Sequence, residues 1–214
     1  RTEVLKYLAD LGLRLDWCSS IDSPVEFAAL NDQAETVRFL IAKGASTDIH
    51  DAHHVSSMNF IIAKHAWRAA QVLIEHGAMD GYYYRCDTEW FAARNGQLEL
   101  LRAVLLQRPS QKAELINKYY NNPAYMGFLS SMASMFPWHN TPEDERLPSA
   151  GAFGTLLHAA TVGGHLNVVR FLVEEGTSIQ HIEAELETAN RMGWTEIEQY
   201  LSQHIAARPG ALNP

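Results

Sequence analysis

Histidine and aspartate are concentrated between Asp48 and His54, the segment whose residue types are best suited to metal chemistry. Its sequence, DIHDAHH, offers five potential ligands in seven residues. Imidazole nitrogens combined with a carboxylate can bind zinc or nickel. A short run of ligands on a loop fixes no coordination geometry, however, so this pattern alone does not establish a metal centre.

Catalytic signatures are absent from the sequence. It contains no G-x-S-x-G, no H-E-x-x-H and no G-x-x-x-x-G-K motif. The acidic pair Glu174 and Glu175 occupies adjacent positions, which do not face each other on a helix. We therefore predict that the chain is not an enzyme and has no catalytic residue, metal or cofactor.

Apolar residues recur at the spacing of one helix face, in short stretches that end at glycine. The segment Thr155–Gly176, TLLHAATVGGHLNVVRFLVEEG, is typical of a short helix before Gly164 and a second, apolar helix before Gly176. Glycine is favoured at helix ends because it tolerates positive φ. The apolar positions of the second helix have counterparts earlier in the chain: Val37, Leu40 and Ile41 correspond to Val169, Leu172 and Val173.

The same pattern returns at a fixed period. Gly77 lies one period after Gly44, and Gly176 lies four of the same periods after Gly44. Further copies begin at 23–29 (SPVEFAA) and 87–96 (DTEWFAARNG). These copies resemble the ankyrin repeat, a unit of about 33 residues with the signature T-P-L-H-x-A. The resemblance implies an all-α ankyrin-repeat solenoid of stacked helix-turn-helix units with short hairpin loops, because one unit cannot bury its apolar face alone.

We expect a single repeat domain over residues 1–205. Gly96 and Gly164 are about two periods apart, so we expect a degenerate unit between them. The stretch 109–150 is expected to open with a helix around Gln111–Tyr120, and PAYMGFLSSMASMF, with Pro123 at its first turn, is expected to be the first helix of that unit. Since the chain starts within what resembles a second helix, we also expect it to be part of a longer protein with further domains. The predicted divisions are 1–22 (partial unit), 23–55, 56–86 and 87–108 (regular units), 109–150 (degenerate unit with an insertion), 151–180 (regular unit), 181–205 (C-terminal cap) and 206–214 (flexible tail).

Several residues have structural explanations. Pro24 suits the first turn of a helix. Asp32 and His65 stand where Gly164 stands in its copy, and both residue types tolerate positive φ better than most. His158 matches the histidine of the family signature, so the resemblance implies that its side chain ties adjacent turns together by hydrogen bonds.

Composition restricts the classes of partner. The formal net charge of −8 argues against nucleic acid, which requires a concentrated basic face. No run of 18 apolar residues is present, so we predict no membrane insertion. The two cysteines, Cys18 and Cys86, fall in separate predicted units, which favours reduced thiols and a cytoplasmic protein.

The resemblance also implies where partners bind. Ankyrin proteins contact partners through hairpin tips and through the solvent face of the first helix just before the turn. Lys64, Arg94 and Asn95 would then form a partly basic patch for an acidic or hydrogen-bonding peptide. Carried onto this sequence, the partner-binding residues are Ser20, Asp22, Leu30, Asn31, His53, Val55, Lys64, Tyr83, Tyr84, Arg94 and Asn95.

Two of the hairpin segments allow more than one interpretation. The resemblance makes the segment Asp48–His54 a polar hairpin tip, and we prefer this to a metal site. Tyr82, Tyr83 and Tyr84, followed by Arg85, either form a binding hot spot or pack on the neighbouring hairpin. The function we predict is protein–protein interaction, as part of a scaffold or adaptor. The alternative is a substrate- or target-recruiting domain of a larger enzyme, including a secreted bacterial or viral effector acting in host cytosol.

Overall fold

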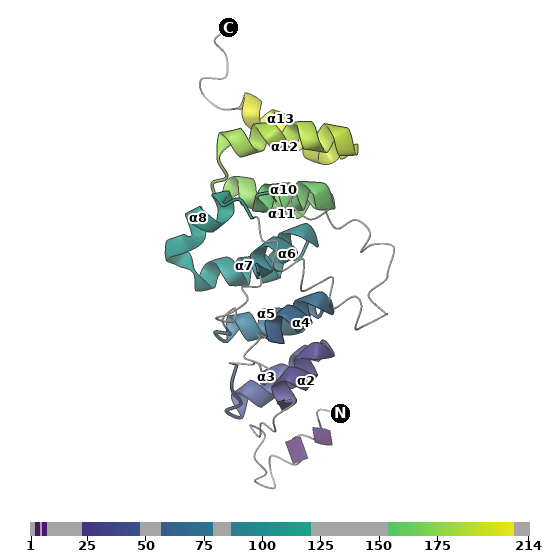
Figure 1. Ribbon diagram of the computed structural model, residues 1–214, viewed down its shortest axis with the longest axis vertical. Helices are drawn as coiled ribbons and strands as arrows, with labels where there is room; N and C mark the ends of the chain where they lie inside the picture. The colour runs from purple at the N-terminus through teal and green to yellow at the C-terminus, as the bar shows by residue number, and fades with distance from the viewer. Residues whose placement is uncertain are drawn as a thin grey trace. The chain divides into compact units, whose positions relative to one another are not determined.

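The computed structural model describes residues 3–4, 6–7, 23–47, 57–78, 87–120 and 154–207. It forms two compact units, Arg1–Thr88 and Glu89–Pro214, and each is described by itself. Regular structure in the described residues is helical, apart from one isolated antiparallel bridge between Tyr120 and Gly154 (Figure 1). The all-α prediction is confirmed.

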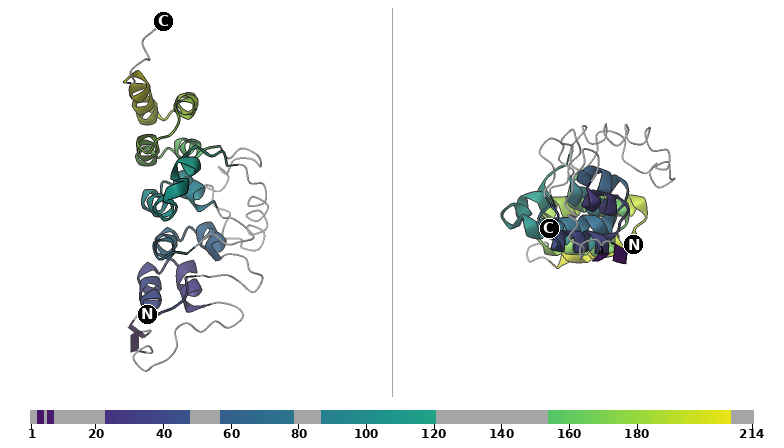
Figure 2. Two further views of the ribbon diagram at one scale, coloured as in Figure 1. Left: turned by 90° about the vertical axis from the view of Figure 1, so that its left-hand side faces the viewer. Right: turned by 90° about the horizontal axis from the view of Figure 1, so that it is seen from below.

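The described residues of the first unit form two helix pairs, each joined by a tight turn, besides helical residues at 3–4 and 6–7. The first helices of the pairs, α2 and α4, pack on each other, and so do the second helices, α3 and α5. Figure 2 shows these purple and blue pairs nearly end-on. The apolar positions predicted for α3 are correct at Val37 and Leu40, both fully buried. The helices span α2 Pro24–Leu30, α3 Ala34–Ala42, α4 Ser57–Ala63 and α5 Trp67–Glu75.

The described residues of the second unit form three helix pairs and one flanking helix. Its pairs are α6 with α7, α10 with α11, and α12 with α13; α6 begins at Thr88, one residue before the unit. The helices span α6 Thr88–Arg94, α7 Leu98–Gln107, the 3₁₀ turn η1 Pro109–Gln111, α8 Lys112–Asn117, α10 Leu156–Gly163, α11 Leu166–Glu174, α12 Ile179–Met192 and α13 Thr195–Ala206.

Local sequence explains the helix starts. The hydroxyl of Ser23 accepts a hydrogen bond from the backbone N–H of Glu26 at 3.1 Å, and Pro24 occupies the first turn, as predicted. Thr155 caps α10 in the same way, accepting from the backbone N–H of His158 at 3.1 Å. Free backbone donors at both N-termini are thus satisfied by residues that the sequence places directly before them.

The turns between paired helices adopt positive φ, as their residue types predicted. Asp32 and His65 have φ of 51° and 54°. At Gly96 and Gly164, a side chain is disfavoured by lack of space as well as by the positive φ. A Cβ at Gly96 would lie 2.6 Å from the ring of His165, and one at Gly164 would lie 2.9 Å from the ring of Trp194. Each of these two turns therefore receives an aromatic ring from the next turn.

The second helices of this unit are also linked in order. The guanidinium of Arg102 in α7 lies 4.7 Å from the ring centroid of Phe171 in α11, and Arg170 in α11 lies 5.4 Å from that of Tyr200 in α13. Such cation–π contacts favour close approach of neighbouring helices. The order of adjacent pairs is therefore α6–α7, α10–α11, α12–α13.

This order bears on one expectation. The turns at Gly96 and Gly164 touch, so the degenerate unit expected between them in the sequence does not separate these two turns. The helix expected around Gln111–Tyr120 is shorter, Lys112–Asn117, and Tyr120 forms the bridge to Gly154 instead. Residues 121–153 lie outside the described residues.

Helix α8 flanks the repeats instead of continuing them. The side-chain oxygen of Asn117 accepts a hydrogen bond from the backbone N–H of Ser178 at 2.8 Å, and Lys112 forms an ion pair with Glu175. Both partners lie at the α11–α12 connection. Among the described residues, no helix is long and apolar enough to cross a membrane.

Asp32 joins the two helix pairs of the first unit. Its Oδ1 accepts a hydrogen bond from the backbone N–H of Ala69 at 2.9 Å, and its Oδ2 lies 2.9 Å from Nε of Arg68. Ala66, the N-cap residue of α5, has no side-chain cap of its own. The carboxylate of the preceding turn therefore satisfies the N-terminus of α5.

Replacement of Asp32 by alanine should remove this cap and place alanine at a strained positive φ, costing about 1–3 kcal/mol of unfolding free energy. Asp32→Asn keeps an acceptor oxygen and tolerates the turn, so it should cost less than about 1 kcal/mol. Urea unfolding followed by circular dichroism checks both. Equal losses in the two variants would show that charge, and not the cap, is what matters.

Candidate functional site

The predicted partner-binding residues are only partly within the described structure. Leu30, Asn31 and Lys64 lie in the first unit, and Arg94 and Asn95 lie in the second. The patch predicted to combine Lys64 with Arg94 thus draws on both units and stays a prediction. The remaining residues lie outside the described residues: Ser20, Asp22, His53, Val55, Tyr83 and Tyr84, together with Asp48–His54, Cys18, Tyr82, Arg85 and Cys86.

An exposed face runs over the first helices of the first unit. On α2, the side chain of Phe27 is 63% exposed, Asn31 is exposed, and Leu30 is half-buried. Phe60 and Lys64 occupy the register positions of Phe27 and Asn31 in the next repeat, on α4, and α2 packs on α4. We call these five residues the α2–α4 face. It combines apolar area with polar groups at its turn end.

Asn31 and Asn95 have a structural role that we did not predict. The side-chain amide of Asn31 donates to the backbone carbonyl of Phe27 at 2.8 Å, and that of Asn95 donates to Phe91 at 2.9 Å. Each therefore closes the last turn of its helix. The signal was present as a repeated N-x-Q, at 31–33 and again at 95–97.

A buried polar cluster in the second unit was also missed. Tyr120 is 1% exposed, and its hydroxyl lies 3.1 Å from Oε1 of Glu89 and 3.1 Å from the carbonyl of Leu115. Arg108 lies 4.0 Å from the other oxygen of Glu89, which is itself 2% exposed, and the ammonium of Lys118 lies 4.5 Å from the centroid of the Tyr120 ring. A buried carboxylate is tolerated only with such partners.

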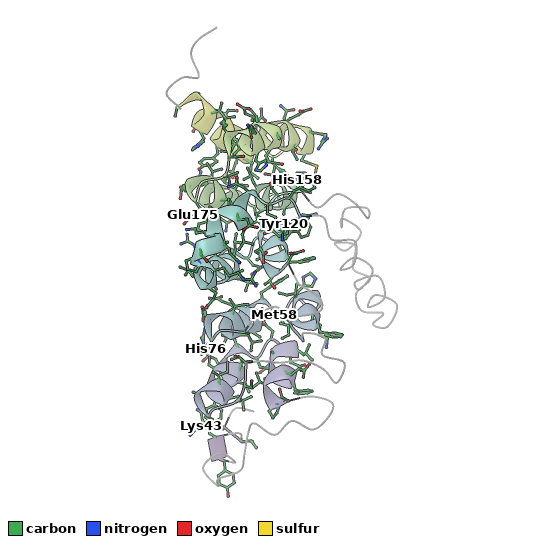
Figure 3. All side chains as sticks on the ribbon, turned by 60° about the vertical axis from the view of Figure 1, so that its left-hand side comes forward. Lys43, Met58, His76, Tyr120, His158 and Glu175 are labelled. Carbon is green, nitrogen blue, oxygen red and sulfur yellow. The ribbon has the colours of Figure 1, made fainter. Side chains whose placement is uncertain are left out.

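This cluster continues into α10 and α12 through Gly154 (Figure 3 labels Tyr120 and His158). The backbone N–H of Tyr120 donates to the carbonyl of Gly154 at 2.9 Å, and the ring of His158 packs against Gly154. Nδ1 of His158 donates to the carboxylate of Glu185, at 2.9 and 3.1 Å to its two oxygens. His158 therefore ties α10 to a helix of the next pair, where the resemblance implied a link between turns.

His165 occupies a confined position between two turns. Its Nε2 donates to the backbone carbonyl of Arg94 at 3.1 Å, and a Cβ at Gly163 would lie 2.5 Å from that carbonyl oxygen. Burial lowers the pKa of His165, and the nearby Arg94 charge lowers it further, whereas the hydrogen bond to the Arg94 carbonyl acts in the opposite direction. The neutral ring is thus the form that suits this contact.

The polar side chains described above act mainly between helices. Among the described residues, no group of three or more His, Cys, Asp or Glu side chains is placed to hold a metal ion. The polar clusters join helices to one another, and Phe27 on the α2–α4 face is one of several large apolar side chains left exposed in the described residues. The structure is that of a helical repeat protein, in which paired helices stack on their neighbours through turns and matching faces.

Comparison with known families gives the class a name. A family model for the ankyrin repeat matches residues 154–183, which cover α10, α11 and the start of α12. This match to one repeat supports the ankyrin-repeat family and confirms the resemblance seen in the sequence. The ankyrin repeat is a protein–protein interaction module. A search of characterised proteins found no match.

Tyr120→Phe should destabilise the protein by about 1–3 kcal/mol, because it removes a hydrogen bond from the buried carboxylate of Glu89 while leaving the ring in place. Tyr119→Phe is the matched control: Tyr119 is the adjacent residue and is 62% exposed, so its loss should stay within about 0.5 kcal/mol. Chemical denaturation measures both. Equal small losses would mean that the Tyr120 hydroxyl contributes nothing.

Stability should fall with acidification through His165. Because its folded pKa lies below the unfolded value of 6.5, the unfolded chain binds the proton first as pH decreases. The contribution of His165 is complete above that value and is lost as pH falls from there through the folded pKa. His165→Gln, which installs the residue found at equivalent position 97, should weaken the decline in unfolding free energy between about pH 7.5 and 5.5. Parallel pH profiles would contradict this.

Proposed function

We propose that this chain is a protein-binding module that holds its partner on the α2–α4 face, with the neighbouring hairpin tips at the rim. The exposure of Phe27 carries the proposal. Its counterparts at the same register position, Phe91 in α6 and Ala159 in α10, are both buried. A large ring left mostly in water, next to half-buried Leu30 and Phe60, is typical of a surface that is covered by a partner.

The scaffold supports such a use. Helix α2 is capped by Ser23 and closed by the Asn31 side chain, and Asp32 ties its turn to the next helix pair. A face held in this way loses little conformational entropy when a partner binds. The predicted tip residues Ser20, Asp22, His53 and Val55 would extend the contact. The two cysteines, predicted to lie in separate units as reduced thiols, favour a reducing cytoplasm as the compartment.

The same surface would serve a scaffold or a domain that recruits a target to a larger enzyme. The two roles differ in what the partner is used for, and both require the α2–α4 face. The proposal therefore concerns the binding surface, and it is tested there.

Phe27→Ser should abolish partner capture without loss of fold. An aromatic anchor at the centre of an interface contributes about 2 kcal/mol or more, which is about thirtyfold in affinity. The matched control is Leu106→Ser, since Leu106 is 78% exposed on α7. Affinity capture from cells that express the protein, quantified by mass spectrometry, compares both with the wild type.

The expected result is a set of proteins shared by the wild type and Leu106→Ser and depleted with Phe27→Ser. Circular dichroism establishes that both variants remain helical. If Phe27→Ser captured the same proteins as the wild type, the α2–α4 face would not be the binding surface.

A further inference from the structure

Lys64 differs from every other described cation of the first unit. Lys6 pairs with Glu3, Arg38 with Glu35 and Glu75, and Arg68 with Asp32, while Lys43 lies over the ring of Phe39. Within the described residues of this unit, Lys64 alone has neither a carboxylate nor a ring as partner. It is exposed, on a protein whose formal net charge is −8.

The surroundings of Lys64 are those of a peptide site. Lys64 comes directly after α4, one helical turn beyond Phe60, and Asn31 comes directly after the adjacent α2, one helical turn beyond Phe27. Asn31 uses its amide nitrogen to close α2, and its side-chain oxygen has no hydrogen-bond partner among the described residues. The face thus presents aromatic area, one acceptor oxygen and one ammonium group that no carboxylate among the described residues compensates.

We infer that the partner segment is an acidic peptide in which a large apolar side chain is flanked by aspartate or glutamate. This inference rests on the proposed function and names its ligand class. The apolar side chain covers Phe27 and Phe60, a backbone N–H of the peptide donates to Asn31, and the carboxylate pairs with Lys64. The aromatic contact supplies affinity, and the ammonium group selects the charge of the peptide.

Other polyanions fit this face less well. Phosphopeptides are bound by arginine clusters, and the nearest arginine in the same turn region, Arg68, is already paired with Asp32. Nucleic acid requires several cations in a row. A single point charge beside an apolar strip matches one carboxylate beside one apolar side chain.

The test is selection of a displayed random-peptide library on the chain of residues 1–214, followed by affinity measurement with the enriched peptides as synthetic probes. We expect sequences with a large apolar residue next to Asp or Glu. Lys64→Glu should weaken their binding by about three- to tenfold, and Lys64→Arg should retain it. Peptides with Asp and Glu replaced by Lys should bind Lys64→Glu better than the wild type.

Lys43→Glu is the matched control, because it makes the same charge change on an exposed lysine at the end of α3. It should leave affinity within about twofold. An equal loss with Lys43→Glu would reduce the effect to net charge and overturn the inference.

The remaining outcomes separate the ligand class from the surface. Peptides that depend on Phe27 but are basic or uncharged, or that ignore Lys64→Glu, would overturn the acidic ligand and leave the α2–α4 face as the binding surface. Peptides that bind Phe27→Ser as well as the wild type would overturn both, and so would failure to enrich any peptide. Enriched phosphate-dependent probes, tested beside their Ser and Glu forms, would replace carboxylate by phosphate as the recognised group.

Discussion

Neighbouring repeats in this protein touch at the turns between paired helices, and there a large side chain from one turn must meet a small residue of the other. In the second unit, His165 packs over Gly96 and Trp194 packs over Gly164. In the first unit the sizes are reversed, since Ala66 stands where those rings stand and Asp32 supplies the side chain from the preceding turn. Two large residues at one contact would clash, and two small residues would leave a void. Dense packing therefore requires one large and one small residue at each contact, and either turn can supply the large one.

This constraint decides which residues remain available for binding. The turn residues are engaged by their neighbours: Asp32 caps α5, and the amide of Asn31 closes α2. The residues one helical turn earlier are not held in these contacts between turns. At this position of the repeat, Phe27 is exposed whereas its equivalent Ala159 is buried. Function can therefore vary at the first-helix face while the turns keep the spacing between helices constant. The described residues of a single unit already provide both the fixed frame and the variable surface.

Local patterns in the sequence predicted local structure well. Turn glycines, the place of Pro24 in the first turn of α2, and the positive φ of Asp32 and His65 follow from residue types at a fixed period. The contact between the turns at Gly96 and Gly164 was not predicted, because a spacing of about two periods is equally consistent with an inserted repeat and with a segment that loops out. The role of Asn31 was missed for another reason: an exposed asparagine before a turn has the same local signal whether it binds a partner or its own helix.

The base of the intervening segment shows why the repeats can remain continuous across it. The chain leaves at Tyr120 and returns at Gly154, where the two backbones are joined by one hydrogen bond. Extending a segment whose ends are already fixed together costs little additional loop entropy. At this junction the buried Glu89 carboxylate accepts a hydrogen bond from the Tyr120 hydroxyl at 3.1 Å and lies 4.0 Å from Arg108, contacts that reduce the cost of burying its charge. The α6–α7 and α10–α11 pairs can therefore pack as adjacent repeats whatever the length of chain between Tyr120 and Gly154.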